Sequence, residues 1–162
     1  MTDTTPRSTT PSRRLPSAAV VIGTVYALCV VVPLVYLALV VAIGLDPNGS
    51  DTARQEIPAI GLVGTTALAI GVLPGIYLAK SDSASRIGAI GYGALSVVTL
   101  VLFWSGAPGV LGAVAAWLGG LTRGRTPYPG APRVFAIIGL SVAILNSAVS
   151  VTWSVIGAFI PH

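Results

Sequence analysis

Long apolar runs alternate with short polar segments along most of the chain. The runs cover residues 18–45, 57–79, 87–104, 107–122 and 134–160, and none of them contains Asp, Glu, Lys or Arg. Unpaired backbone groups in lipid are so costly that only helices or closed barrels span a bilayer. Barrel strands alternate apolar and polar residues, and these runs do not. The pattern therefore predicts an all-α integral membrane protein.

The number of crossings depends on residues 107–122. At 1.5 Å per residue this run makes a helix of roughly 24 Å, which is short for a hydrocarbon core of about 30 Å. The turn formers of residues 105–109 lie at its start and predict a turn that reaches the outer face. Five transmembrane helices result. The alternative joins residues 87–121 into one kinked third helix and leaves four.

The distribution of charge favours five crossings. With a cytoplasmic N-terminus, the basic residues on the inner side are Arg7, Arg13, Arg14, Lys80, Arg86, Arg123, Arg125 and Arg133. Arg54 lies on the outer side with Asp46, Asp51 and Glu56. Cytoplasmic loops carry an excess of Lys and Arg, and four crossings would move the last three arginines outside. We therefore expect the N-terminus in the cytoplasm, the C-terminus outside, and the cell membrane as the location.

Composition supports a membrane protein with one domain. Hydrophobic residues make up 54% of the chain and charged residues 9%, whereas soluble domains average about 25% charged residues. Residues 1–17, rich in Thr, Ser, Pro and Arg, predict a disordered cytoplasmic tail, and residues 18–160 form the transmembrane domain. The net charge of +4 comes from residues at the ends of apolar runs, so we expect the lipid bilayer as partner and no nucleic acid.

Small residues recur every four positions in three of the runs. They are Ala67, Gly71, Gly75 and Ala79; Gly112, Ala116 and Gly120; and Gly139, Ala143 and Ser147, with the polar Asn146 beside them. Small residues let helix backbones approach closely in lipid. The pattern predicts helix-packing faces. Pro33 and Pro74 lie inside runs and predict kinks.

Residues 87–151 resemble small Gly-rich multi-pass bacterial membrane proteins, of the actinobacterial type, that are classed as a domain of unknown function. The matching positions are Gly112, Ala116, Gly120, Arg123, Arg125 and Gly139. The chain departs from that pattern in its Pro-rich loop at residues 127–132. Because the group has no assigned activity, the resemblance implies architecture only.

Candidate chemistry is scarce. His162 ends the chain, and Cys29 lies in an apolar run where a small buried hydrophobe is expected. Asp46, Asp51 and Glu56 indicate a solvated outer loop. Trp104 and Trp153, like Tyr77, lie towards the ends of runs, which is typical of interfacial rings. We expect no enzyme, no cofactor and no metal.

Two functions remain at the level of sequence. The first is a non-catalytic accessory or scaffold protein whose small-residue faces pack against other membrane proteins or a second copy. The second is a small transporter or channel component that works as an oligomer around a weakly polar path, with Asn146 as its best feature. The absence of ionisable residues from the runs is evidence against proton coupling.

Overall fold

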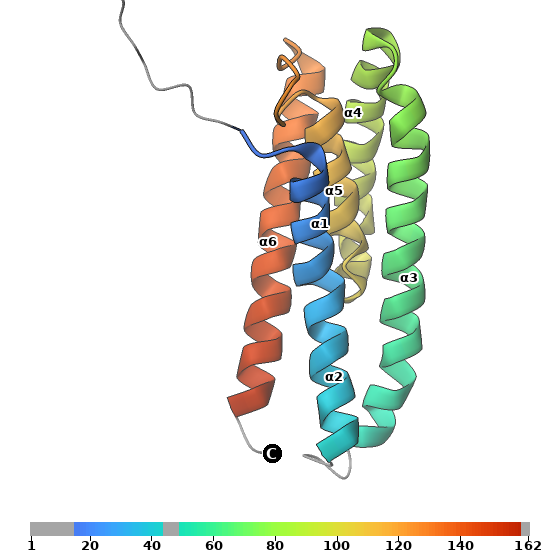
Figure 1. Cartoon of the computed structure of the whole chain (residues 1–162), viewed down its shortest axis with the longest axis vertical. Coiled ribbons are helices and arrows are strands. Elements are labelled where there is room, and N and C mark those ends of the chain that lie inside the picture. The colour runs from blue at the N-terminus through green and yellow to red at the C-terminus, as the bar shows by residue number, and fades with distance from the viewer. Residues whose placement is uncertain (1–14, 44–48, 160–162) are drawn as a thin grey trace, which may run out of the picture.

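A computed structural model of the chain describes residues 15–43 and 49–159, and within these ranges every regular element is a helix. Four helical segments are long and apolar enough to cross a membrane: Ala18–Ile43, Ala53–Leu78, Asp82–Ser105 and Ala131–Gly157. A shorter apolar helix, Ala107–Leu118, completes the bundle (Figure 1). The prediction of an all-helical protein with membrane-type helices is confirmed for the described residues.

The first crossing combines α1 (Ala18–Tyr26), a π-helical turn η1 (Ala27–Val31) and α2 (Val32–Ile43). The hydroxyl of Ser17 accepts a hydrogen bond from the backbone N–H of Val20 at 3.3 Å and caps α1. The π turn ends at Val31, two residues before Pro33, where a regular helix would meet the proline ring and lose a hydrogen bond. The irregularity expected from Pro33 is therefore taken up one turn earlier. Residues 44–45 of the predicted run lie outside the described residues.

Helices α3 (Gly49–Leu78) and α4 (Asp82–Val98) both begin earlier than their apolar runs. The predicted outer loop over residues 46–56 is wrong from Gly49 onwards, and Glu56 is helical. Residues 53–56, Ala-Arg-Gln-Glu, are good helix formers, and hydropathy overlooked them. In α4 the acidic Asp82 lies in the first turn, where it interacts favourably with the helix dipole. Helix α3 continues through Pro74.

After α4, a 3-10 segment η2 (Thr99–Ser105) leads to Gly106, and the chain then reverses into α5 (Ala107–Leu118). A Cβ atom built at Gly88 of α4 would lie 2.8 Å from Cδ1 of Leu118, so the end of α5 lies beside the start of α4. The alternative of one kinked helix over residues 87–121 is therefore wrong. With 12 residues, α5 is about 18 Å long, shorter than the predicted run and well short of a hydrocarbon core.

The short helix α5 is the core of the bundle. Every residue of α5 except Trp117 is buried, and the helix lies among α1, α3, α4 and α6 (Ala131–Phe159) (Figure 1). Large hydrophobic side chains cover the outside; Leu62 of α3 is 71% exposed and Val101 of η2 is 82% exposed. The bundle thus presents apolar side chains where lipid would be and buries its small residues.

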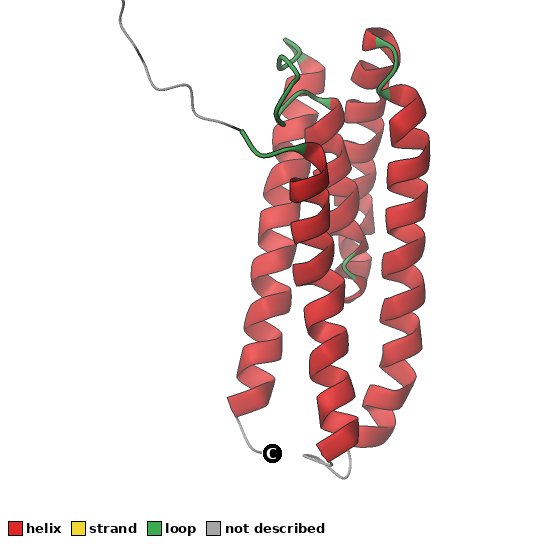
Figure 2. Ribbon diagram, in the orientation of Figure 1, coloured by secondary structure: helices red, strands yellow, loops and turns green. Residues whose placement is uncertain are grey.

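Of the connections that the structure describes, those between α3 and α4 and between α5 and α6 lie at one end of the bundle, and the turn at Gly106 lies within it (Figure 2). Of the predicted tail, residues 15–17 are described, and the carbonyl of Pro16 accepts a hydrogen bond from the backbone N–H of Arg123 at 2.9 Å. The segment before α1 is therefore fastened to the loop that joins α5 to α6. Residues 1–14 lie outside the described residues.

Candidate functional site beneath the central helix

The N-terminal end of α5 lies inside the bundle. Gly106 has φ of 75°, and a Cβ atom there would lie 2.7 Å from the carbonyl oxygen of Cys29. The Ser105 hydroxyl accepts a hydrogen bond from the N–H of Ala107 at 3.3 Å and so binds the first turn of α5. Ser105 is fully buried, so the expectation that this turn reaches the outer face is wrong. Irregular backbone at membrane depth requires such enclosure by protein.

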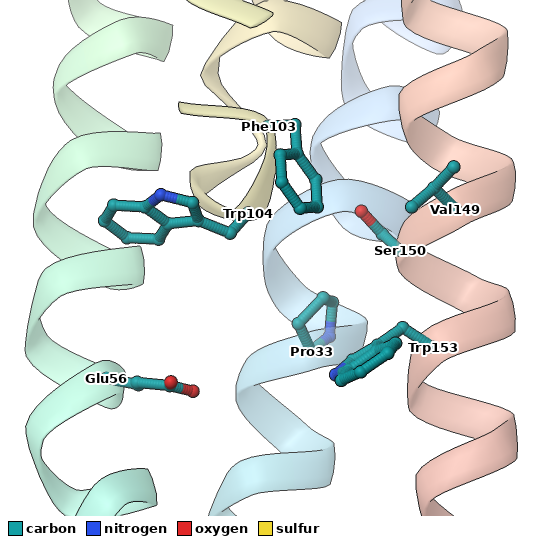
Figure 3. Close-up of a pocket in the computed structure, with 7 residues that line it drawn as sticks. All are labelled: Pro33, Glu56, Phe103, Trp104, Val149, Ser150 and Trp153. Carbon is teal, nitrogen blue, oxygen red and sulfur yellow. The ribbon is translucent and has the colours of Figure 1, made fainter. Parts of the chain in front are cut away.

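Because α5 begins at this depth and does not run the full length of the bundle, the surrounding helices leave a pocket on the side of the turn away from α5 (Figure 3). Its volume is about 360 Å³, at the lower end of the range of about 300–1,000 Å³ for small-molecule sites. Four elements contribute, namely α2, α3, η2 and α6. The lining residues are Pro33, Glu56, Phe103, Trp104, Val149, Ser150 and Trp153.

The pocket combines aromatic rings with a single carboxylate. Of the described residues that line it, Glu56 is the one ionisable residue, and Ser150 adds a hydroxyl. Figure 3 shows the side chain of Glu56 extending from α3 towards the space beside Pro33, with the ring of Trp153 extending from α6 towards the same proline. Such a surface can bind an apolar body and place one positive charge.

Sequence reasoning missed this pocket because it gave each lining residue a separate explanation. Glu56 was expected in a solvated loop, and Trp104 and Trp153 were expected as interfacial rings. The structure brings all three to one pocket. A usable signal was present: a run too short to cross leaves part of the bundle without a central helix. Asp46, another acidic residue of the predicted loop, lies outside the described residues. The C-terminal His162 lies outside them too.

The predicted small-residue face of α3 meets α5. Cβ atoms at Gly71 and Gly75 would lie 3.0 Å from Val114 Cγ2 and 2.8 Å from Trp117 Cζ3, respectively. Ala67 is buried on the same helix. Ala79 follows the end of α3, and its carbonyl accepts a hydrogen bond from Arg125. These residues therefore pack inside the chain.

The faces of α5 and α6 meet each other. A Cβ atom at Gly139 would lie 2.9 Å from the carbonyl oxygen of Gly112, while Ala116 and Ala143 are buried nearby in the same two helices. Gly120, expected on the fourth helix, lies beyond the end of α5 with φ of 84°. It belongs to the turn after α5 because only a residue without Cβ fits that conformation easily.

A small polar cluster lies within the core beside α5. The hydroxyl of Ser147 is 3.2 Å from the thiol sulfur of Cys29 and donates to the carbonyl of Ala143 at 2.8 Å. Asn146 is 4% exposed, and its Nδ2 has no hydrogen-bond partner among the described residues. Gly109 lets α5 approach, since a Cβ there would lie 3.3 Å from that Nδ2 atom. Across the described ranges, no three His, Cys, Asp or Glu residues lie close enough to hold a metal ion.

The end of the bundle opposite the pocket is held together by polar contacts. Arg125 donates to the hydroxyl of Ser85 at 2.9 Å as well as to Ala79. The hydroxyl of Tyr128 donates to Asp82 at 2.8 Å, and the guanidinium of Arg86 lies 5.0 Å from the centre of the Tyr128 ring. These contacts join the α5–α6 loop to the start of α4 and have a structural role.

Comparisons with protein-family models, with curated proteins and with solved structures found no significant match to this chain. The resemblance of residues 87–151 to a domain of unknown function therefore stays a prediction.

Proposed function

We propose that this protein is a non-catalytic membrane protein that binds a small organic ligand in the pocket beneath α5, as a small transporter or channel component. The observation that supports this most is the pocket itself, which the half-length helix α5 leaves between α2, α3, η2 and α6. Broken or short helices that end inside a bundle are typical of transporter substrate sites.

The accessory or scaffold hypothesis has less support, because it depended on the small-residue faces. Gly71, Gly75, Gly112 and Gly139 all make close contacts inside the chain. A face that already packs against α5 is not free for a partner helix. Assembly with other membrane proteins would have to use the large apolar side chains on the outside.

We further propose that the end of the bundle with the α3–α4 and α5–α6 connections faces the cytoplasm of the cell. At this end Arg86 lies over the ring of Tyr128, and Arg125 donates a hydrogen bond to Ser85. Three more basic residues lie in or next to the same connections, namely Lys80, Arg123 and Arg133. A concentration of Lys and Arg favours the cytoplasmic side. The pocket then lies towards the outer half of the membrane.

A pocket-filling variant tests the function. Ser150→Phe places a ring in the pocket, and Ser141→Phe makes the same change at an exposed position of α6. The purified protein in dodecyl maltoside is challenged with benzyltrimethylammonium, neopentylbenzene and phenylacetate, and the melting temperature is measured. We expect at least one probe to raise the melting temperature of the wild type and of Ser141→Phe, but not of Ser150→Phe. No effect of any probe at millimolar concentration, or an equal effect in all three proteins, would contradict the proposal.

A further inference from the structure

We propose that the pocket beneath α5 selects an organic cation, a free solute with an ammonium group on a compact apolar or aromatic body. This inference rests on the proposed function and names its ligand class. The carrying observation is that one carboxylate, Glu56, and three aromatic residues, Phe103, Trp104 and Trp153, line the same pocket.

Charge sets the sign of the ligand. Among the described residues, Glu56 is the one ionisable residue in the lining, so the described lining presents a single negative charge and no cationic side chain. The Glu56 side chain is exposed, so it is free to meet a ligand. The apolar surface on one side of it screens its charge less than water would and so strengthens the attraction of a cation. An anion would be repelled by the same group, and a neutral ligand would gain nothing from it.

The aromatic residues determine which kind of cation fits. Phe103, Trp104 and Trp153 are 52%, 42% and 75% exposed, so their ring surfaces are not used up by contacts within the chain. Cations bind over the faces of such rings, and quaternary ammonium groups are recognised in this way. A small hydrated metal ion would instead need several oxygen ligands, and the lining offers one carboxylate and one hydroxyl, that of Ser150.

The pocket size limits the ligand to a compact molecule. A volume of about 360 Å³ accommodates one aromatic ring or short branched chain with its ammonium group, at the small end of typical ligand sites. Pro33 and Val149 supply apolar surface for this body.

Two probes of equal shape test the sign of the charge. Benzyltrimethylammonium and neopentylbenzene differ in having nitrogen or carbon at the branch point, so only the first is a cation. Binding is followed by tryptophan fluorescence in dodecyl maltoside, which has no charge and no amine. A Trp117→Phe background leaves Trp104 and Trp153, both in the pocket lining, as the reporters.

We expect benzyltrimethylammonium to bind saturably and roughly tenfold more tightly than neopentylbenzene, the size of effect that a cation–aromatic contact together with a carboxylate supports. Glu56→Gln should remove this preference. Asp82→Asn is the matched control, since it removes one carboxylate at the opposite end of the bundle, and should retain it. Ser150→Phe should abolish binding of both probes.

Each other outcome has a distinct meaning. Equal binding of the two probes, or an unchanged preference in Glu56→Gln, overturns the cation proposal but leaves a ligand pocket in place. If the wild-type protein binds neither probe, the proposed function is overturned as well. Displacement of the cation by phosphatidylethanolamine added to the micelle at similar concentration would identify a lipid headgroup as the occupant and would overturn the free solute.

Discussion

Gly112 of α5 and Gly139 of α6 bring their backbones into direct contact at the centre of the bundle. A Cβ atom at Gly139 would lie 2.9 Å from the Gly112 carbonyl oxygen and 3.2 Å from its Cα atom. Lipid provides no hydrophobic force between helices, so close packing of this kind has to stabilise the pair. The contact also determines how deeply α5 lies against α6.

A methyl group at this contact should be costly. Gly112→Ala places a Cβ atom against the backbone of Gly139, and overpacking typically destabilises by about 1–3 kcal/mol. Gly91 on α4 is the matched control because a Cβ there meets nothing within 4 Å. Gly91→Ala should be neutral or stabilise by up to about 1 kcal/mol, since alanine favours helix. Unfolding in detergent measures both, and equal stability of the two variants would contradict close packing at Gly112.

Two of the glycines in the α5–α6 loop should differ in the same way. Gly120 and Gly124 have φ of 84° and 85°, where alanine costs about 1–2 kcal/mol. A Cβ at Gly120 would also lie 2.8 Å from the carbonyl carbon of Thr126, whereas Gly124 has nothing within 4 Å. Gly120→Ala should therefore lower the free energy of unfolding by about 1–3 kcal/mol more than Gly124→Ala. An equal loss would mean that the conformation alone matters at Gly120.

Arg125 should stabilise the basic end of the bundle. Arg125→Gln removes the hydrogen bonds to Ser85 and to the carbonyl of Ala79, and bonds to charged groups contribute about 1.5–3 kcal/mol. Arg123→Gln removes the same charge from an exposed side chain and should cost little. Melting temperatures in detergent provide the comparison, in which similar values for both variants would speak against the contact.

Labelling of single cysteines tests the orientation. In a Cys29→Ala background, an impermeant maleimide applied to whole cells should modify Gln55→Cys but not Ser83→Cys or Thr126→Cys, all three at exposed positions. Ser105→Cys should resist labelling from both sides, because Ser105 is buried. Labelling of Thr126→Cys in whole cells would reverse the orientation or remove a crossing.

The sequence showed which segments form apolar helices, but it did not show at which residues those helices begin. The absence of charge from the apolar runs indicates where lipid can surround a helix, because transfer of each residue into lipid depends on that residue. At Gly49 and Asp82 the helices extend past the runs. The good helix formers of residues 53–56 continue α3, and the acidic Asp82 in the first turn of α4 interacts favourably with the helix dipole. Hydropathy contains no information about such extensions.

The candidate site was beyond reach of the sequence for a related reason. Glu56, Trp104 and Trp153 are far apart in the chain, and each had an adequate local explanation as a solvated acid or an interfacial ring. They line one pocket because α5 begins partway along the bundle and leaves the space between the other helices unfilled. The depth at which α5 begins follows from packing at Gly106, against Cys29, and at Gly112, against Gly139.

The sequence by itself determined that the chain forms apolar helices and that its basic residues lie between particular helices, because both depend on local composition. The tertiary structure decided that the short run becomes the buried centre, that the small-residue faces are used inside the chain, and that Glu56 lines a pocket with aromatic rings. These depend on which side chains meet across the bundle. Such contacts are a matter of shape between distant residues, which no local pattern encodes.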